Sequence, residues 1–219
     1  MKLQLYQQLL HNLGDGAVRG KLFVFEGPDG VGKTTIVAAL EEKLRGENTS
    51  FEFMSFPGKE SGTLGSVIYD IHHSPDRYGI TAISELAKQA LHIAAHIDAI
   101  ETRIQPLLRA GVNVVLDRFW WSTIVYGEVG GVDTSALGQL VAAERLVWAD
   151  TLPSIAFLVD REQPIDRSDK MEAWLKLRSR YGELSSVEGR DYRVVVLGNT
   201  TTVEEVVNRA SSLIEAIAL

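Results

Sequence analysis

One stretch of this chain combines the residue types and the spacing of a phosphate-binding loop. Residues 25–35 read FEGPDGVGKTT, which contains the pattern G-x-x-x-x-G-K-T. Glycines let the backbone curl so that successive N–H groups face phosphate oxygens, while Lys33 would reach the terminal phosphates and the Thr34 hydroxyl would bind Mg²⁺. The pattern predicts that the protein binds a nucleoside triphosphate with Mg²⁺. We expect the phosphates to be surrounded by Gly27, Pro28, Asp29, Gly30, Val31, Gly32, Lys33, Thr34 and Thr35.

A strand must end at this loop and a helix must begin from it. The apolar run of residues 22–25 predicts the strand, and the apolar pattern of residues 34–45, which stops at Gly46, predicts the helix. Such a helix points the positive end of its dipole at the bound anion. Because the loop lies between two such elements, we interpret it as a nucleotide site and not as a glycine-rich turn without a ligand.

The rest of the chain alternates between short apolar runs and helical patterns. We expect further strands over residues 51–55, 112–116, 154–160 and 192–197. We expect helices over residues 63–72, 84–110, 133–148, 170–185 and 203–217. Continuous apolar strands that alternate with helices predict an α/β domain whose parallel sheet is covered on both faces. Functional residues should then lie at the carboxyl edge of the sheet.

Local signals mark the ends of several of these helices. Asp133 is suited to begin one helix, and Thr202 with Glu205 has the spacing of a capping box for the last one. Pro106 should kink the helix that ends near residue 110. Apolar residues at helical spacing before residue 14 predict a short amphipathic helix. We therefore divide the chain into an N-terminal extension, 1–18, and a main domain, 19–219.

The composition is that of an ordinary soluble domain of 219 residues, with 45% hydrophobic and 23% charged residues. A net charge of -7 argues against general binding to nucleic acid or to anionic membranes. The chain has no cysteine, which excludes disulfides and thiolate chemistry. No apolar run reaches membrane-spanning length, and the first residues lack the apolar core of a signal peptide. We expect a cytoplasmic protein without nucleic-acid or membrane partners.

Four stretches of the chain form an ordered set of motifs: residues 25–35, residues 56–65 (FPGKESGTLG), residues 117–126 (DRFWWSTIVY), and Asp166-Arg167 followed by residues 177–181 (LRSRY). In this order they resemble motifs of the thymidylate kinase family of P-loop nucleoside monophosphate kinases. The third, similar to the family's D-R-[YF]-x-x-S motif, is the one that points to this family. The resemblance implies a three-layer P-loop fold with five parallel strands in the order 2-3-1-4-5. It also implies a homodimer and transfer of the γ-phosphoryl group of ATP to a nucleoside monophosphate, with dTMP the first choice.

The resemblance also implies roles for single residues. Lys33, Arg118 and Arg167, the last in a lid over residues 161–170, would hold and neutralise the transferred phosphoryl group. Asp117, together with Thr34, would hold Mg²⁺. We place the acceptor nucleotide near Asp29, Phe56, Lys59, His96, Arg118, Trp121 and Tyr126. The loop after the last strand, where the family contacts adenine, carries Asn199.

Several features depart from the family's pattern. Ile97 stands where we expect a phosphate-binding arginine, Ile93 where we expect an aromatic ring that stacks on the base, and Gly127 where a polar side chain often contacts the base. The lid is also short. The donor side thus matches the family and the acceptor side differs. Two alternatives therefore stay open: a kinase of the same fold with a nucleoside or modified nucleotide as acceptor, and a regulatory ATP-binding protein without acceptor chemistry.

Two clusters have both a functional and a structural interpretation. His92 and His96 lie one helical turn apart, so they could share a metal ion, line the acceptor pocket or pack in the core. If no arginine lies near Ile97, either histidine could supply part of the acceptor contact. Among the three aromatic residues 119–121, at least one ring should pack in the core, and one tryptophan could stack on the base.

Overall fold

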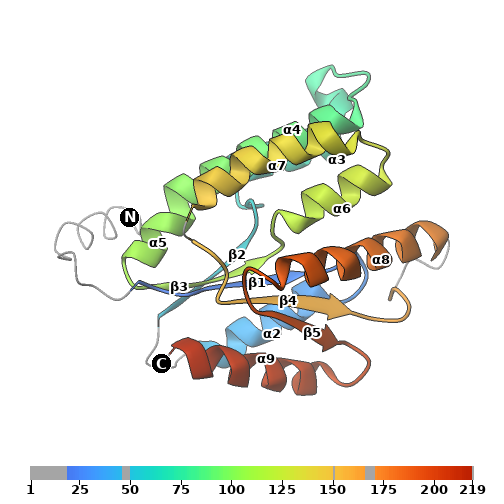
Figure 1. Ribbon diagram of the computed structural model, residues 1–219. Coiled ribbons are helices and arrows are strands. Elements are labelled where there is room, and N and C mark those ends of the chain that lie inside the picture. The colour runs from blue at the N-terminus through green and yellow to red at the C-terminus, as the bar shows by residue number, and fades with distance from the viewer. Residues whose placement is uncertain (1–18, 46–49, 150, 166–170, 219) are drawn as a thin grey trace.

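The computed structural model describes residues 19–45, 50–149, 151–165 and 171–218. At its centre lies a five-stranded parallel sheet in the order β2-β3-β1-β4-β5 (Figure 1). The strands are β1 (Leu22–Glu26), β2 (Phe51–Ser55), β3 (Asn113–Asp117), β4 (Ile155–Asp160) and β5 (Val194–Gly198). The predicted strands, their parallel direction and their order are confirmed, and only their ends differ slightly from the expectation.

Helices cover both sides of the sheet, which gives the three layers expected (Figure 1). On one side α2 (Lys33–Leu44) and α9 (Val203–Ala218) pack against each other. The other side carries α3 (Leu64–His73), α4 (Glu85–Ala99), α5 (Gln105–Arg109), α6 (Trp121–Val129), α7 (Thr134–Trp148) and α8 (Met171–Glu188). On that side α4 and α7 lie side by side.

Strand residues alternate between two apolar cores because successive side chains of a strand point to opposite faces. From β1, Leu22 and Val24 pack in the core beneath α4 to α7, whereas Phe23 and Phe25 pack in the core beneath α2 and α9. All four side chains are buried. Phe25 also stacks on Phe157 of β4, with 4.7 Å between ring centroids. Burial on both sides thus explains why the strands read as continuous apolar runs.

The predicted capping residues begin their helices. The Asp133 carboxylate accepts a hydrogen bond of 2.9 Å from the backbone N–H of Ala136 at the start of α7. Thr202 and Glu205 exchange the two hydrogen bonds of a capping box, each 3.3 Å long, at the start of α9. Each contact satisfies a backbone donor that the first turn of a helix leaves without a partner.

Two parts of the fold differ from the expectation. The helix predicted over residues 84–110 is interrupted, because a π-helical turn, Ile100–Ile104, separates α4 from α5. Pro106 lies in the first turn of α5, where its missing N–H costs little. In addition, no pattern in the sequence predicts α6. This short helix packs against α4, α7 and α8, so it lacks the polar stripe that marks a surface helix.

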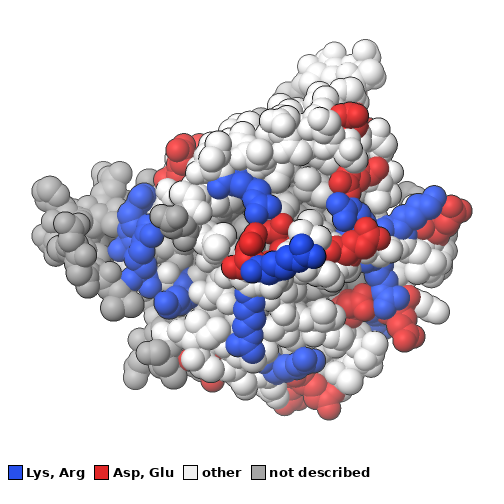
Figure 2. Space-filling model, in the orientation of Figure 1, with Lys and Arg blue, Asp and Glu red and all other residues white. Residues whose placement is uncertain are grey.

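No helix within the described ranges is long and apolar enough to cross a membrane. On the face shown in Figure 2, lysines and arginines are interspersed with aspartates and glutamates and do not gather into one basic patch. The helix predicted before residue 14, within the extension 1–18, and Arg167 of the lid lie outside the described residues. The division of the chain at residue 18 therefore stays a prediction.

Candidate active site

The phosphate loop joins β1 to α2, and two of its glycines are required by its geometry. Gly32 has φ +92°, and a Cβ there would lie 2.5 Å from the side-chain nitrogen of Asn199. Gly27 has φ +139°, and a Cβ there would clash with the carbonyl oxygen of Val159. Any other residue would be strained at both positions. The loop therefore lies tightly against its neighbours and directs the N-terminus of α2 toward the point where a phosphate would bind.

Lys33, the first residue of α2, is buried under this loop. Its ammonium group donates hydrogen bonds to the carbonyl oxygens of Gly27 at 2.6 Å and Pro28 at 2.9 Å. Burial, followed by the positive charge of Arg118, lowers the pKa of Lys33 to about 8. The lysine is thus held within the loop, and the protein alone stabilises its charge only weakly.

Thr34 and Asp117 form the pair expected of a magnesium site. The Thr34 hydroxyl donates to one carboxylate oxygen of Asp117 at 2.7 Å. The other oxygen of Asp117 is buried and has no hydrogen-bond partner in the part of the chain that the structure describes. A buried carboxylate oxygen is costly without a partner, and hydroxyl and carboxylate oxygens are ligands that Mg²⁺ prefers. These two residues therefore fit a magnesium ion.

Arg118, directly after β3, is held in a strained conformation. Its φ of +81° lies in the left-handed region that residues other than glycine rarely adopt. The guanidinium group pairs with the Asp29 carboxylate, donates to the Ser122 hydroxyl at 3.2 Å and lies over the ring of Tyr126. The Tyr126 hydroxyl in turn accepts from the backbone N–H of Asp29 at 3.0 Å. Such strain is common where a side chain must be aimed for function.

Glu26, at the end of β1, ties the phosphate loop to the segment around Arg118. The residue is fully buried, and its carboxylate accepts from the backbone N–H groups of Phe119 at 2.8 Å, Ser122 at 3.0 Å and Gly27 at 3.2 Å. Burial raises the pKa of Glu26, although the charge of Arg118 opposes this. No role for Glu26 was predicted from the sequence. Its place directly before the first glycine of the motif was the available signal.

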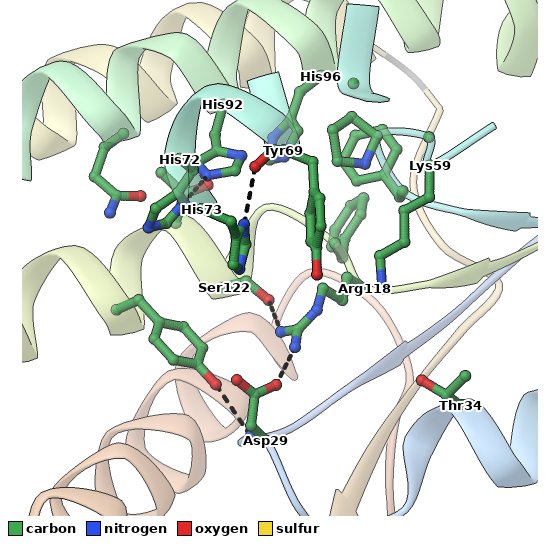
Figure 3. A pocket seen from close by; sticks show the side chains of 18 residues that line it. Asp29, Thr34, Lys59, Tyr69, His72, His73, His92, His96, Arg118 and Ser122 are labelled. Atoms are coloured by element: carbon green, nitrogen blue, oxygen red, sulfur yellow. Dashed lines mark hydrogen bonds and ion pairs between the residues drawn. The ribbon is translucent and has the colours of Figure 1, made fainter. Parts of the chain in front are cut away.

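A cavity of ≈ 380 Å³ opens beside the phosphate loop (Figure 3). Of the predicted site residues, it brings together Asp29, Thr34, Phe56, Lys59, His96, Arg118 and Tyr126. Its cationic side chains are Arg118 and Lys59, and the Lys59 ammonium lies over the ring of Tyr69 at 5.4 Å. In Figure 3, Lys59 and Arg118 lie on the side of the cavity nearer to Thr34, and the histidines lie farther from it. The cavity therefore has a cationic end and an imidazole-rich end.

The imidazole-rich end is a histidine wall formed by His72 and His73 of α3 and His92 and His96 of α4. Nδ1 of His72 and Nε2 of His92 share a hydrogen bond of 2.9 Å. Burial, followed by the neighbouring His96, lowers the pKa of His92 to about 3, so this imidazole is neutral at physiological pH. The structure shows no cluster of three or more candidate metal ligands in the described ranges. It therefore gives no support to a metal at His92 and His96.

The structure places the isoleucines of α4 away from the acceptor side. Ile93 and Ile97, assigned to the acceptor side, pack in the apolar core, and His92 and His96 line the cavity instead. Residues four apart share one face of a helix, so α4 turns the pair His92 and His96 toward the cavity and the pair Ile93 and Ile97 toward the core. Of these four residues, the cavity is thus lined by the two histidines and by neither isoleucine.

One further prediction for the acceptor side needs correction, and the glycine that departs from the family's pattern has a structural explanation. Trp121 does not line the cavity; its ring is fully buried and its indole N–H donates to the Tyr192 hydroxyl at 2.9 Å. The reason is that α6 begins at Trp121 and turns this ring into the core. Gly127 leaves no room for a side chain that could contact a base, because a Cβ there would lie 2.7 Å from Leu137 of α7. This glycine allows α6 and α7 to pack closely.

Asn199 and the described part of the lid both contact the phosphate loop. Asn199 is buried, and its side-chain amide donates to the carbonyl oxygen of Val31 at 2.7 Å, so it supports the loop from behind. In the lid, the backbone N–H of Ile165 donates to the carbonyl oxygen of Gly30 at 2.9 Å. The first half of the short lid therefore rests on the loop.

His96 has a partner that sequence reasoning missed. Its Nδ1 lies 2.8 Å from a carboxylate oxygen of Glu144, and the other oxygen of Glu144 accepts from the indole N–H of Trp148 at 3.1 Å. Glu144 is fully buried, and the ring of Phe56 lies 4.3 Å from that of His96. Glu144 and Trp148 lie on α7, whereas His96 lies on α4. Only the packing of these two helices brings the three residues together.

The chain is similar to known thymidylate kinases in sequence and in fold. It is 35% identical over 144 residues to the thymidylate kinase of Chlorobium chlorochromatii, a match that spans 64% of this chain and 60% of that protein. It is 30% identical over 207 residues to the thymidylate kinase of Chlamydia muridarum, a match that spans 89% of this chain and 98% of that protein. A crystal structure of thymidylate kinase from Ehrlichia chaffeensis has the same fold, with a TM-score of 0.71 at 24% identity over 90% of this chain and 99% of that one.

The family assignment rests on both the matched residues and the arrangement of the site. The family model of thymidylate kinase matches residues 25–209, which includes the phosphate loop, the Asp117-Arg118 pair and the histidine wall. Members of this family are nucleoside monophosphate kinases that use ATP as the phosphate donor. Because the match covers most of the chain and the sheet has the order that the family resemblance implied, this chain belongs to the thymidylate kinase family.

Proposed function

We propose that the protein transfers the γ-phosphoryl group of Mg²⁺-bound ATP to dTMP, which gives dTDP and ADP. The observation that carries this proposal is the position of Arg118 and Lys59, which line one cavity with Thr34 and Asp29 at the edge of the phosphate loop. A donor phosphate in the loop and an acceptor phosphate at these two cations would lie next to each other. In-line transfer requires that proximity.

Each charged residue near the loop has a task in such a transfer. Phosphoryl transfer crowds anionic oxygens together, so catalysis depends mainly on positioning and on positive charge. Lys33 and the backbone N–H groups of the loop would bind the donor phosphates, and Arg118 would neutralise charge on the group in transit. Thr34 and Asp117 would hold Mg²⁺, which supplies further neutralisation of the phosphate oxygens when it is bound. Glu26 keeps the two halves of this machinery in a fixed relation.

The acceptor nucleotide would lie along the cavity with its two ends in different surroundings. Its phosphate would bind Lys59 and Arg118, and its sugar would lie near Asp29. The base would then extend toward Phe56 and the histidine wall, which is the part of the cavity without cations. Mainly neutral walls suit an uncharged base, and a cationic end suits its phosphate.

A second candidate function is favoured by the histidine wall. The family resemblance leads us to expect an arginine on the long helix, whereas α4 presents His92 and His96 to the cavity. A kinase of the same fold with a different nucleotide as acceptor would account for this change. A purely regulatory ATP-binding role is less well supported, because Arg118 and Asp117 keep an arrangement that phosphoryl transfer would use.

A label-transfer assay decides between these functions. The protein is incubated with Mg²⁺ and γ-³²P-ATP, and in turn with dTMP, dUMP, dCMP, dGMP, thymidine or no acceptor. We expect the highest kcat/KM for dTMP, with the label in dTDP. A higher kcat/KM for another acceptor would favour the second candidate. Release of labelled inorganic phosphate at the same rate with every acceptor, without transfer, would contradict both.

Three further properties are proposed from the family resemblance alone. They are a homodimer, a cytoplasmic location and a contact from Arg167 to the transferred phosphoryl group. Sedimentation velocity of the full chain tests the first, and kinetics of an Arg167→Ala variant test the last.

A further inference from the structure

A buried carboxylate behind the cavity controls one member of the histidine wall. Glu144 of α7 is fully buried, and its two oxygens contact Nδ1 of His96 at 2.8 Å and the indole N–H of Trp148 at 3.1 Å. The ring of Phe56 lies 4.3 Å from the ring of His96 and restrains it further. His96 itself lines the cavity. The transfer steps described above make no use of Glu144, so the presence of this group in the core needs another explanation.

Hydrogen-bond chemistry fixes the position of a proton on His96. A carboxylate can only accept, so Nδ1 of His96 must be the donor. In the neutral imidazole, Nε2 then carries a lone pair. Nε2 makes no hydrogen bond within the described residues. It is also absent from the buried side-chain atoms that lack a partner there, so Nε2 is accessible from the cavity that His96 lines. His96 therefore presents a hydrogen-bond acceptor to a ligand that lies against α4.

We propose that Glu144 is a positioning residue that sets the base specificity of the acceptor site through His96. It holds Nε2 of His96 as the acceptor for the imide N–H of a pyrimidine-2,4-dione base. Thymine and uracil carry this N–H at N3, whereas cytosine has a lone pair at N3, which would face the lone pair of Nε2 without a proton between them. This inference rests on the proposed function, since it takes the ligand of the cavity to be a nucleoside monophosphate.

Trp148 is the reason that a carboxylate, and not an amide, is needed at position 144. The indole N–H can only donate, so it requires an oxygen of residue 144. In a Glu144→Gln variant, the single amide oxygen is taken by Trp148 and the NH₂ group faces Nδ1 of His96. Nδ1 must then accept, and the proton moves to Nε2. The substitution thus reverses the polarity of Nε2 with almost no change in shape.

A second substitution provides a matched rescue. A Trp148→Phe substitution removes the indole donor, so in the Glu144→Gln/Trp148→Phe double variant the amide oxygen can turn back toward His96. Nδ1 is then again the donor, and Nε2 regains its lone pair. The single Trp148→Phe variant keeps the carboxylate and serves as the control for the loss of the large ring from the core.

Binding and NMR measurements on the full chain at about pH 8 test this proposal without any need for turnover. Titration calorimetry compares dTMP with 5-methyl-dCMP, which differ only at the edge of the base. Two-bond ¹H–¹⁵N spectra give the tautomer of His96, assigned with a His96→Gln variant. In the wild type we expect the Nδ1–H tautomer and binding of dTMP about tenfold or more tighter than that of 5-methyl-dCMP. The Glu144→Gln variant should show the Nε2–H tautomer of His96 and lose the preference for dTMP, while its Kd for ATP stays unchanged. The double variant should regain the Nδ1–H tautomer and the preference for dTMP.

The outcomes separate this inference from the proposed function. A wild-type protein that binds neither nucleotide would overturn the proposed function and this inference with it. Three results would each overturn this inference alone. The first is equal binding of the two nucleotides by the wild type, and the second is an Nε2–H tautomer of His96 in the wild type. The third is an unchanged preference for dTMP in a Glu144→Gln variant whose His96 tautomer has switched. If the variant does not fold, the tautomer and the binding ratio of the wild type still decide.

Discussion

The donor and acceptor halves of the cavity are built by different means. The donor half is one loop and the helix that follows it, and the backbone makes its geometry: glycines at positive φ turn the chain, and carbonyl oxygens hold Lys33. The acceptor half is assembled from side chains of α3, α4 and α6, and Glu144 of α7 stands behind them. These side chains meet only in the folded chain.

This difference explains why only one half departs from the family's pattern. A Cβ at Gly27 or Gly32 would clash at once, so the donor half tolerates little change. Side chains on separate helices can be exchanged one at a time while the sheet and the loop stay in place. We infer that the donor half determines the type of reaction and that the acceptor half determines which nucleotide is phosphorylated.

Removing the lysine of the donor half should have the largest effect. A Lys33→Ala variant should lower kcat by about 10³-fold or more, because it removes a preorganised positive charge at the transferred phosphate. The fold should survive, since burial already destabilises this charge. A Lys43→Ala variant, which changes an exposed lysine of the same helix, is the matched control. Similar kcat values for the two variants in a label-transfer assay would refute the assigned role.

Changing the magnesium pair should have the next largest effect. An Asp117→Asn variant should raise the Mg²⁺ concentration for half-maximal activity by about 10- to 100-fold, because it removes a buried carboxylate charge beside Thr34. The measurement is a Mg²⁺ titration at saturating ATP and dTMP. If the Mg²⁺ concentration for half-maximal activity were unchanged in this variant, Asp117 would not be a magnesium ligand.

The sequence predicts the donor half far better than the acceptor half. The strand, the loop and the N-terminus of α2 are contiguous, so spacing alone places Gly32, Lys33 and Thr34. The contacts of Glu26 were missed because they reach Phe119 and Ser122 across the sheet edge. The prediction placed Ile93 and Ile97 on the acceptor side, although one residue along a helix is enough to exchange a core face for a cavity face.

The remaining misses share one physical cause. The ring of Trp121 turns inward because α6 is a helix, and α6 has no polar stripe by which a sequence could reveal it. Glu144 contacts His96 only because α4 and α7 pack side by side, and no spacing along the chain contains that information. Local patterns therefore predict sites made by one segment, and they fail where side chains from several helices converge.

The acceptor half should make the protein sensitive to acid. An unfolded chain gives His92 a pKa of about 6.5, whereas burial lowers its pKa to about 3 in the folded protein. Between these two pH values His92 is protonated only in the unfolded chain. The contribution of His92 to the free energy of unfolding is therefore fully present above about pH 6.5 and is lost as the pH falls below that value. The free energy of unfolding should decrease by about 1–2 kcal/mol from this residue between about pH 6.5 and pH 5.

Denaturant titrations of wild type and a His92→Gln variant measure this contribution. The variant keeps a polar group for His72 and should show a flatter decline in acid. A His73→Gln variant, which changes an exposed member of the histidine wall, is the control. Parallel pH profiles for wild type and His92→Gln would contradict a neutral, buried His92.

The donor half should respond to pH through a smaller effect, the uptake of a proton with ATP. The pKa of Lys33 is lowered to about 8 by burial and by Arg118, and phosphate charges beside the ammonium would raise it. At about pH 8, ATP binding should therefore take up about half a proton. Calorimetry in buffers of different ionisation enthalpy measures this number. No proton uptake in the wild type, or the same uptake in a Lys33→Met variant, would contradict the assignment.

Arg118 is the residue that joins the two halves, so its removal tests the account most directly. The measurement is single-turnover transfer of ³²P from γ-³²P-ATP to dTMP by wild type and by Arg118→Ala, with labelled inorganic phosphate followed in the same samples. We predict label in dTDP for the wild type, and transfer about 10²- to 10³-fold slower in the variant with ATP affinity unchanged. Label that appears only in inorganic phosphate with the wild type, or equal transfer rates for the two proteins, would contradict the account.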